Sequence, residues 1–209
     1  MIIVNFKAYK DATGDKAKEL SRNCKKASEK TGEKVISVPQ HQDLRIVEGE
    51  AFGQHIDPVT QGSHTGHITA EGLSSTKASG TLINHSEMRM SPEKVKQSVE
   101  RARSEGLTTV VCAQSPTECE KYSKFNPDFV AFEPPELIGG DISVSSAEPE
   151  LVEEAVERSE VEVLTGAGIK DKKDVETSID LGCKGVLVAS GVVKSENSYE
   201  EVLELCDGL

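Results

Sequence analysis

Eight short apolar or β-branched runs alternate along the chain with segments that carry helix-start signals. This alternation limits the possible folds more than anything else in the sequence. The runs are Ile2–Phe6, Val35–Val38, Ala51–His55, Thr81–Ile83, Thr109–Cys112, Phe129–Phe132, Val161–Leu164 and Gly185–Val188. Most are continuously apolar, which indicates strands buried on both faces of a parallel sheet. The third run is the weakest because Gly53 and Gln54 interrupt it.

The intervals between the runs predict helices. Ser91-Pro92 precedes an apolar stripe with a 3.6-residue period, and proline suits the first position of a helix. The other predicted helices begin near Asp15, Ser115, Pro149, Asp171 and Ser198, and Ser115 with Glu118 and Ser198 with Glu201 are predicted to cap their helices as capping boxes. Glycines at 32 and 182 end two of them. Only a short helix fits between Gln42 and Glu48.

Eight units in 209 residues leave about 26 residues for each strand and its helix. Eight parallel β-α units close into a barrel, whereas five or six form an open sheet. The sequence therefore predicts an α/β fold, a (β/α)8 barrel that occupies residues 1–209 as a single domain. Such barrels usually need ~250 residues, so some helices must be trimmed.

Net charge and cysteine content limit the binding partners and the cellular compartment that are expected for the protein. The chain has 24 Lys and Arg against 36 Asp and Glu, a net charge of −12, which disfavours nucleic acid and anionic membranes as partners. An anionic small molecule needs a local positive pocket. The five cysteines are scattered without a CxxC pair, as in reduced cytosolic proteins, and no apolar run approaches the ~20 residues of a membrane span. We expect a cytoplasmic protein.

Unusual residues follow five of the runs, at the end where the active site of a parallel barrel lies. These segments are Asn5-Phe6-Lys7, Asn84-His85-Ser86-Glu87, Glu133 to Gly140, Thr165-Gly166-Ala167-Gly168 and Ala189-Ser190-Gly191. Taken alone, each of these also has an ordinary interpretation: Lys7 as a solvated loop residue, His85 as a core histidine, Glu133 as a helix-capping carboxylate and the glycines as a tight turn. Their convergence on one barrel mouth favours a functional interpretation.

The chemistry that such a set allows is narrow. A glutamate can remove a proton from carbon next to a carbonyl, while a histidine and a lysine polarise the oxygen. Glycine amides after the seventh and eighth strands can bind a phosphate. This chemistry requires no metal, flavin or nicotinamide, so no cofactor is expected.

Six segments in family order resemble the triosephosphate isomerase family, and specifically its shorter archaeal branch. They are VNFKAYKDATG (4–14), QHIDPVTQGSHTGHITAE (54–71), LINHSEMRM (82–90), VAFEPPELIGG (130–140), LTGAGI (164–169) and GVLVASGV (185–192). The resemblance implies a cofactor-independent aldose–ketose isomerase of glycolysis and gluconeogenesis. Such an enzyme interconverts dihydroxyacetone phosphate and D-glyceraldehyde 3-phosphate through an enediolate.

The resemblance also implies roles for individual residues. Glu133 is the expected base, His85 the neutral electrophile, Lys7 the substrate-binding cation that stabilises the oxyanion, and Glu87 a supporting acid. The remaining residues expected to bind the substrate or its phosphate are Asn5, Phe6, Ile138, Gly139, Gly168, Ala189 and Ser190. A lid from about Pro134 to Glu148 is expected to exclude water. Within it, Asp141 departs from the glycine that the family usually has.

The loop Gly62–His67 has two interpretations. By resemblance it reaches into a neighbouring subunit beside Asn5 and Lys7, which implies a homo-oligomer, a dimer or a tetramer. Alternatively, His64 and His67 are a metal pair, although HxxH without a third ligand is a weak zinc signal. Three other functions stay open at this point: a phosphate-binding barrel with a different reaction, a catalytically silent scaffold, and a metal hydrolase that uses these two histidines.

Overall fold

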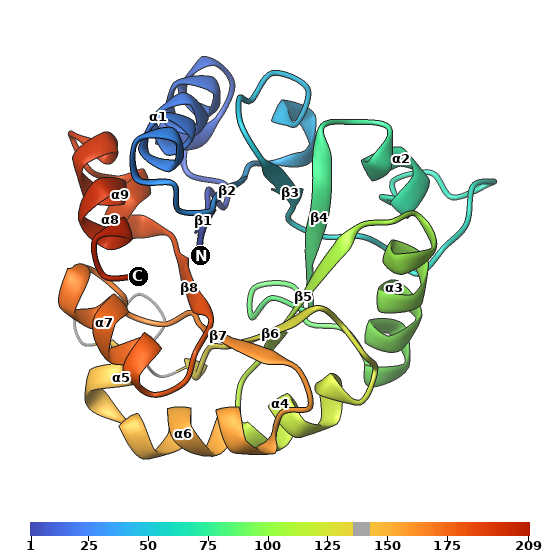
Figure 1. Ribbon diagram of the computed structural model, residues 1–209. Helices are drawn as coiled ribbons and strands as arrows, with labels where there is room; N and C mark the ends of the chain where they lie inside the picture. The colour runs from blue at the N-terminus through green and yellow to red at the C-terminus, as the bar shows by residue number, and fades with distance from the viewer. Residues whose placement is uncertain (136–142) are drawn as a thin grey trace.

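In residues 1–135 and 143–209, which the computed structural model describes, eight parallel strands form a closed barrel (Figure 1). They are β1 (Ile2–Asn5), β2 (Val35–Val38), β3 (Ala51–Gly53), β4 (Ala78–Ile83), β5 (Thr108–Ala113), β6 (Phe129–Phe132), β7 (Glu162–Thr165) and β8 (Gly185–Val188). Each pairs with the next along the chain, and β8 pairs with β1, where Leu187 lies opposite Ile3. Each predicted run overlaps one strand, so the predicted (β/α)8 barrel is confirmed.

Helices surround the barrel as an outer ring (Figure 1). The α-helices are α1 (Asp15–Thr31), α2 (Ala70–Ser74), α3 (Pro92–Ser104), α4 (Pro116–Ser123), α5 (Val144–Ala147), α6 (Pro149–Arg158), α7 (Lys172–Asp180), α8 (Ser190–Val193) and α9 (Ser198–Cys206). The elements that the structure describes also include the 3-10 helices η1 (Lys10–Ala12) and η2 (His41–Asp43). Only η2 lies between β2 and β3, and the five-residue α2 follows β3, so the trimming that the chain length requires occurs there.

Side-chain caps start the helices largely as the sequence predicts. The side chains of Ser91, Ser115 and Asp171 each accept a hydrogen bond from a backbone N–H in the first turn of α3, α4 and α7. The predicted cap at Ser198 is wrong, because Asn197 caps α9. The Ser198 hydroxyl instead accepts a hydrogen bond from Asn23 of α1 at 3.1 Å, and asparagine caps helices as well as serine does.

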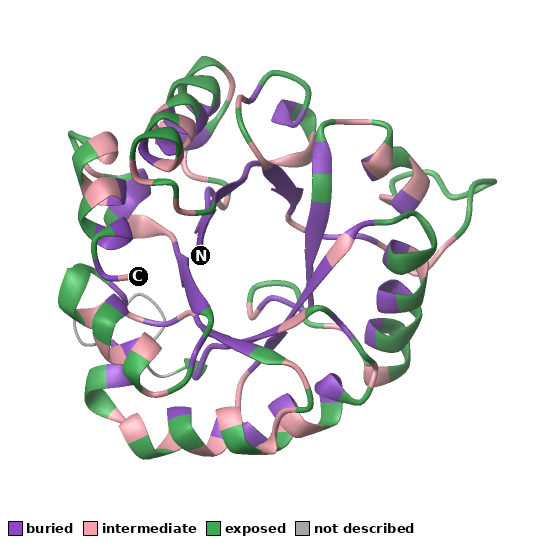
Figure 2. Ribbon diagram, viewed as in Figure 1, coloured by how far each residue is buried: buried purple, intermediate pink, exposed green. Residues whose placement is uncertain are grey.

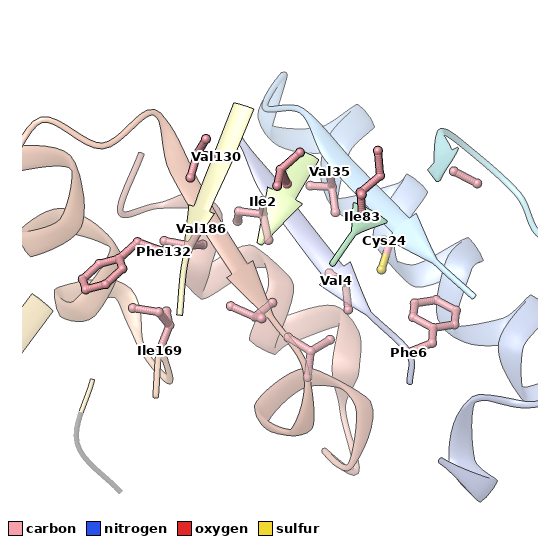
Figure 3. Close-up of a cluster of buried hydrophobic side chains, with 14 of the residues drawn as sticks. Ile2, Val4, Phe6, Cys24, Val35, Ile83, Val130, Phe132, Ile169 and Val186 are labelled. Atoms are coloured by element: carbon pink, nitrogen blue, oxygen red, sulfur yellow. The ribbon is translucent and has the colours of Figure 1, made fainter. Parts of the chain in front are cut away.

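Alternation along the strands divides the core into two layers. Residues from all eight strands fill the barrel interior: Ile3, Ile36, Val38, Phe52, Leu82, Val110, Cys112, Ala131, Leu164 and Leu187. The neighbouring positions, such as Ile2, Val4, Val130 and Val186, belong to the layer between the barrel and the helices (Figure 3). The strands are therefore buried on both faces, while the helices expose their outer faces (Figure 2). This two-sided burial explains why the strand sequences are continuously apolar.

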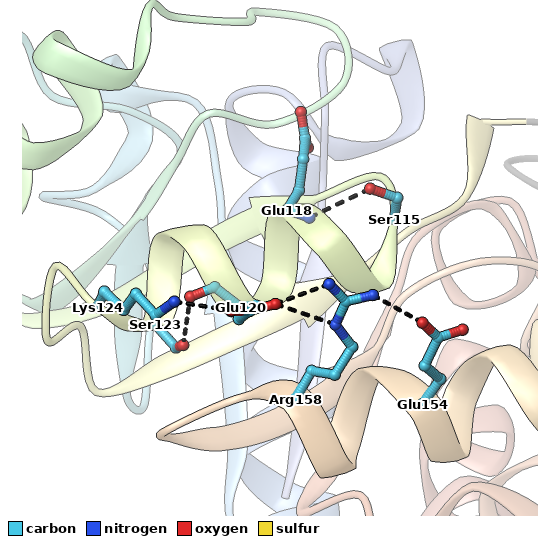
Figure 4. A network of polar contacts seen from close by, with 7 residues as sticks. All are labelled: Ser115, Glu118, Glu120, Ser123, Lys124, Glu154 and Arg158. Atoms are coloured by element: carbon cyan, nitrogen blue, oxygen red, sulfur yellow. Dashed lines mark hydrogen bonds and ion pairs between the residues drawn. The ribbon is translucent and has the colours of Figure 1, made fainter.

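Charged side chains connect α4 to α6 on the surface of the barrel (Figure 4). The Glu120 carboxylate accepts hydrogen bonds from Arg158, at 2.7 and 3.1 Å, and from Lys124 at 2.7 Å, and Arg158 also donates to Glu154. The cations Lys124 and Arg158 lower the pKa of Glu120 to about 2. The network joins the helices that flank β6, the strand that ends next to Glu133.

Within the described residues, no helix combines the length and the apolar character that crossing a membrane requires.

Candidate active site

A cavity of about 330 Å³ lies where the carboxyl ends of the strands meet their following loops. Seven of the residues expected to catalyse the reaction or bind the substrate line it: Asn5, Lys7, His85, Glu133, Gly168, Ala189 and Ser190. They come from the ends of β1, β4, β6, β7 and β8. The closed barrel thus brings together residues that are up to 185 positions apart.

The expected role of Phe6 in the substrate pocket is not supported by its position. Its side chain is fully buried in the outer core layer (Figure 3). The reason is the two-residue period of β1: Phe6 follows Ile2 and Val4 outward, whereas Asn5 follows Ile3 inward. The predictions for Ile138, Gly139 and Asp141 lie outside the described residues.

Glu133 lies one residue beyond β6 and is 3 % exposed. Its backbone N–H donates to the carbonyl of Ala113 at 2.8 Å, which extends the pairing of β5 with β6. Its Oε1 lies 3.7 Å from Nε2 of His85, and its Oε2 is buried without a hydrogen-bond partner among the described residues. Burial raises the pKa of Glu133, against the opposing effects of His85, Cys112 and Lys7. A buried, more basic carboxylate that faces a cavity is suited to proton abstraction.

Gly166, directly after β7, allows this carboxylate its position. A Cβ on Gly166 would lie 2.5 Å from Cγ of Glu133 and 2.9 Å from Cδ, too close for any side chain. The Gly166 backbone N–H donates to the carbonyl of Phe132 at 3.0 Å. The glycine therefore lets the end of β7 pack directly against the side chain of Glu133.

His85 is held by its neighbours in one orientation. Asn84 has a left-handed backbone (φ 66°); its side-chain amide donates to the carbonyl of Cys112 at 2.9 Å, and its oxygen accepts from the N–H of Met90 at 2.9 Å. The Glu87 N–H donates to Nδ1 of His85 at 3.2 Å. Because Nδ1 accepts this bond, a neutral imidazole carries its proton on Nε2, the nitrogen that faces Glu133.

Asn84 belongs to one of the five segments noted in the sequence, but the sequence did not predict that Asn84 would position His85. Its left-handed backbone and its two partners depend on tertiary contacts, so local sequence holds no signal for them.

Lys7 also has a left-handed backbone (φ 47°). Its N–H donates to the side-chain oxygen of Asn5 at 3.0 Å, and its carbonyl accepts from the side chain of Gln54 at 2.9 Å. Its ammonium forms an ion pair with Glu87 at 3.0 Å, and the Lys7 side chain is only 13 % exposed. Such backbone strain persists where several contacts fix it, and here they hold a cation at the cavity.

The opposite side of the cavity consists of small residues. Gly168 has a left-handed backbone (φ 72°), and Ala189 and Ser190 lie where β8 passes into α8. Small side chains leave backbone N–H groups accessible, as anion binding requires. Two further lining residues, Tyr9 and Lys170, were missed in the sequence. Lys170 directly follows the GAGI segment, so its place in the sequence could have indicated it.

The loop 62–67 is exposed and borders a second cavity of about 440 Å³ next to the first. Thr65, Gly66 and His67 line this second cavity together with Lys7 and Glu87. The rings of His64 and His67 meet edge to face with centroids 5.7 Å apart. Among the residues that the structure describes, no three His, Cys, Asp or Glu side chains gather as a metal site, so the HxxH pair has no third ligand there.

The model of the triosephosphate isomerase family matches residues 1–207. The triosephosphate isomerase of Methanocaldococcus jannaschii is 42 % identical over 98 % of this chain and 98 % of its own length. That of Methanopyrus kandleri is 44 % identical over 100 % and 97 %. The crystal structure of triosephosphate isomerase from Bartonella henselae shares the fold, with a TM-score of 0.77 at 19 % identity over 99 % of this chain and 97 % of that one. With its barrel, its cavity at the strand ends and these relatives, the chain belongs to the triosephosphate isomerase family.

Proposed function

We propose that this chain interconverts dihydroxyacetone phosphate and D-glyceraldehyde 3-phosphate, with Glu133 as the base. The observation that carries the proposal is the environment of the Glu133 carboxylate. It is buried at the strand ends with one oxygen unpartnered among the described residues and the other 3.7 Å from His85 Nε2. The family membership supports the same reaction.

The proposed reaction moves one proton between adjacent carbons. The Glu133 carboxylate removes a proton from C1 of the ketone, and the electron pair of the broken C–H bond forms the enediolate. The Nε2–H of His85 and the ammonium of Lys7 stabilise the negative charge on the substrate oxygens. A proton passes from the C1 hydroxyl to the C2 oxygen through Nε2 of His85, and Glu133 then returns its own proton to C2, which gives the aldehyde.

The phosphate is proposed to bind the backbone amides around Gly168, Ala189 and Ser190. These residues line the same cavity as Glu133, and they can hold the dianion while the carbon end reacts. Asn5 supports the substrate site through its hydrogen bond to the Lys7 backbone. Ile138 and Gly139 remain proposed phosphate contacts on the strength of the family resemblance alone.

A coupled assay on the purified protein tests this function. We expect turnover of D-glyceraldehyde 3-phosphate to dihydroxyacetone phosphate, unchanged by a chelator. A protein that binds a two-carbon phosphorylated carboxylate but does not turn over the triose would be a phosphate-binding barrel with another reaction. Failure to bind this analogue would indicate a silent scaffold, and loss of activity with chelator a metal enzyme.

We also propose a homo-oligomer, a dimer or a tetramer, in which the loop Gly62–His67 of one subunit docks beside Lys7 of another. The exposure of this loop and the second cavity beside Lys7 support the docking. Met88, at 56 % exposure, also lines that cavity and offers apolar contact area. Sedimentation of the purified protein measures the assembly.

We infer a cytoplasmic location, with neither nucleic acid nor membrane as a partner. The five free, buried cysteines and the net charge of −12 support this inference. We also infer that residues 1–209 act as one domain, since the pairing of β1 with β8 joins the two ends of the chain in one barrel.

A further inference from the structure

Asp174, in the first turn of α7, gathers hydrogen bonds from two separate segments. Its Oδ1 accepts from the hydroxyl of Ser143 at 2.5 Å and from that of Ser146 at 3.3 Å. Its Oδ2 accepts from the backbone N–H of Lys170 at 2.9 Å. Its main-chain carbonyl accepts from the hydroxyl of Ser145 at 3.2 Å. Three serines around the start of α5 thus converge on one residue of α7.

The loop between β7 and α7 is the second partner of Asp174, and it forms one wall of the proposed phosphate site. Gly166, Gly168 and Lys170 of this loop line the main cavity, whereas Asp174 does not. Gly166 also packs against Glu133. The bond from the Lys170 N–H to Asp174 therefore fixes a loop that faces both the phosphate and the base.

Among the described residues, backbone pairing joins the same two segments at one point only. The N–H of Val144 donates to the carbonyl of Ala167 at 3.0 Å. Ser143 and Ser145 are buried, at 2 % and 1 % exposure, so their hydroxyls need partners within the protein. Asp174 supplies both, which makes it the main polar connection between the α5 segment and the loop.

We propose that Asp174 is a positioning residue: its carboxylate holds the loop after β7 against the α5 segment and thereby sets the affinity of the site for phosphate. The proposal rests on the proposed function, because it assigns the phosphate end of the substrate to this loop. Asp174 touches no reacting atom and acts through the Lys170 N–H and the serine hydroxyls.

A carboxylate suits this task because it only accepts hydrogen bonds. In Asp174→Asn the amide has a single acceptor oxygen, so its NH2 group must face either the Lys170 N–H or the serine hydroxyls. Removal of a negative charge near a phosphate would by itself strengthen phosphate binding. Loss of the fixed loop weakens it. The two effects have opposite signs, so the direction of the change separates positioning from simple electrostatics.

The experiment measures two constants: the dissociation constant (Kd) for inorganic phosphate, by calorimetry, and the KM for D-glyceraldehyde 3-phosphate. For Asp174→Asn we expect both constants to rise about tenfold, the usual effect of losing a hydrogen bond to a charged group, with a smaller change in kcat. The matched control is Asp171→Asn at the cap of the same helix. It removes the same charge, and asparagine retains the cap, so its constants should stay equal or fall.

A second variant keeps the proposal testable if Asp174→Asn does not fold. Ser143→Ala removes one partner of the carboxylate and should also weaken phosphate binding. Where Asp174→Asn does fold, Ser143→Ala added to it should weaken phosphate binding by less than about a further twofold, because groups that act through one contact are not additive.

The inference is overturned if phosphate affinity and KM are unchanged in Asp174→Asn and Ser143→Ala. It is equally overturned if Asp171→Asn weakens binding as much, or if the parent protein binds no phosphate. The parent protein and its variants could bind phosphate with the expected differences in affinity while the parent protein shows no isomerase turnover. That result would refute the proposed function and leave the role of Asp174 in phosphate binding intact. Turnover without any effect of Asp174 on phosphate would do the reverse.

Discussion

Gly166→Ala should slow the reaction without changing any group that takes part in it. The new methyl carbon would lie 2.5 Å from Cγ of Glu133, whereas ordinary contacts begin near 3.4 Å, so the atoms must separate by about 0.9 Å. Cγ is not a free side-chain end, and Glu133 is 3 % exposed, so the carboxylate cannot swing into solvent. Glu133, the proposed base, must itself move.

The size of that movement sets the expected loss. Misplacement of a reacting group by about 1 Å can cost ~10²-fold in rate. We therefore expect kcat to fall about a hundredfold, with a much smaller change in KM because the phosphate end is untouched. Overpacking of this kind also costs about 1–3 kcal/mol of stability, so the melting temperature should decrease while the protein remains folded.

Gly191→Ala is the matched control, since Gly191 lines the same cavity. A Cβ at Gly191 would meet its nearest atom, the carbonyl oxygen of Ile169, at 3.9 Å, which is an ordinary contact. This variant leaves Glu133 in place, so any effect should fall on KM. The coupled isomerase assay gives kcat and KM for both variants. Equal kcat in Gly166→Ala and the parent protein would refute the reasoning, because the base would then tolerate the displacement.

Four further outcomes follow from the same site. Glu133→Asp should bind a transition-state analogue yet lose about 10²-fold in kcat; unchanged kcat would mean that Glu133 is not the base. Lys7→Ala should impair KM and kcat together, and a normal KM would move the substrate site elsewhere. Two bulky charged residues at Thr65 and Gly66 should give folded, nearly inactive monomers; an intact, active oligomer in sedimentation would contradict the interface. Burial raises the pKa of Glu133 above 4.5, so the folded protein loses stability as pH rises from 4.5 to that raised pKa and keeps the full penalty above it. Glu133→Gln should therefore raise Tm at pH 7, and the advantage should disappear below pH 4.5; a gain that persists in acid would point to another cause.

The architecture could be predicted from the sequence because its signals are local. Continuous apolar runs such as Val35–Val38 report burial on both faces, and caps such as Ser115 and Asp171 report helix starts. Neither depends on distant contacts. The wrong cap at Ser198 shows where local rules fail: two neighbouring residues can both cap, and a contact with Asn23 of α1 decides between them.

The site was predictable in part. Lys7, His85 and Glu133 stand at strand ends, and a closed parallel barrel places all its strand ends at one mouth, so their residue types and order were enough to group them. The family resemblance then supplied their roles. The resemblance also placed Phe6 among the substrate-binding residues, but its side chain is buried in the outer core layer.

Only the tertiary structure decided which way side chains face and what holds them there. The two-residue period of β1 turns Asn5 inward and Phe6 outward, and that period becomes meaningful only once the barrel defines an inside. The burial that raises the pKa of Glu133 comes from every element packed around it. Likewise, Asp174 accepts hydrogen bonds from Ser143, which lies 31 positions before it in the sequence, and from Lys170, which lies 4 positions before it. Such contacts arise from packing, and the packing depends on the whole chain.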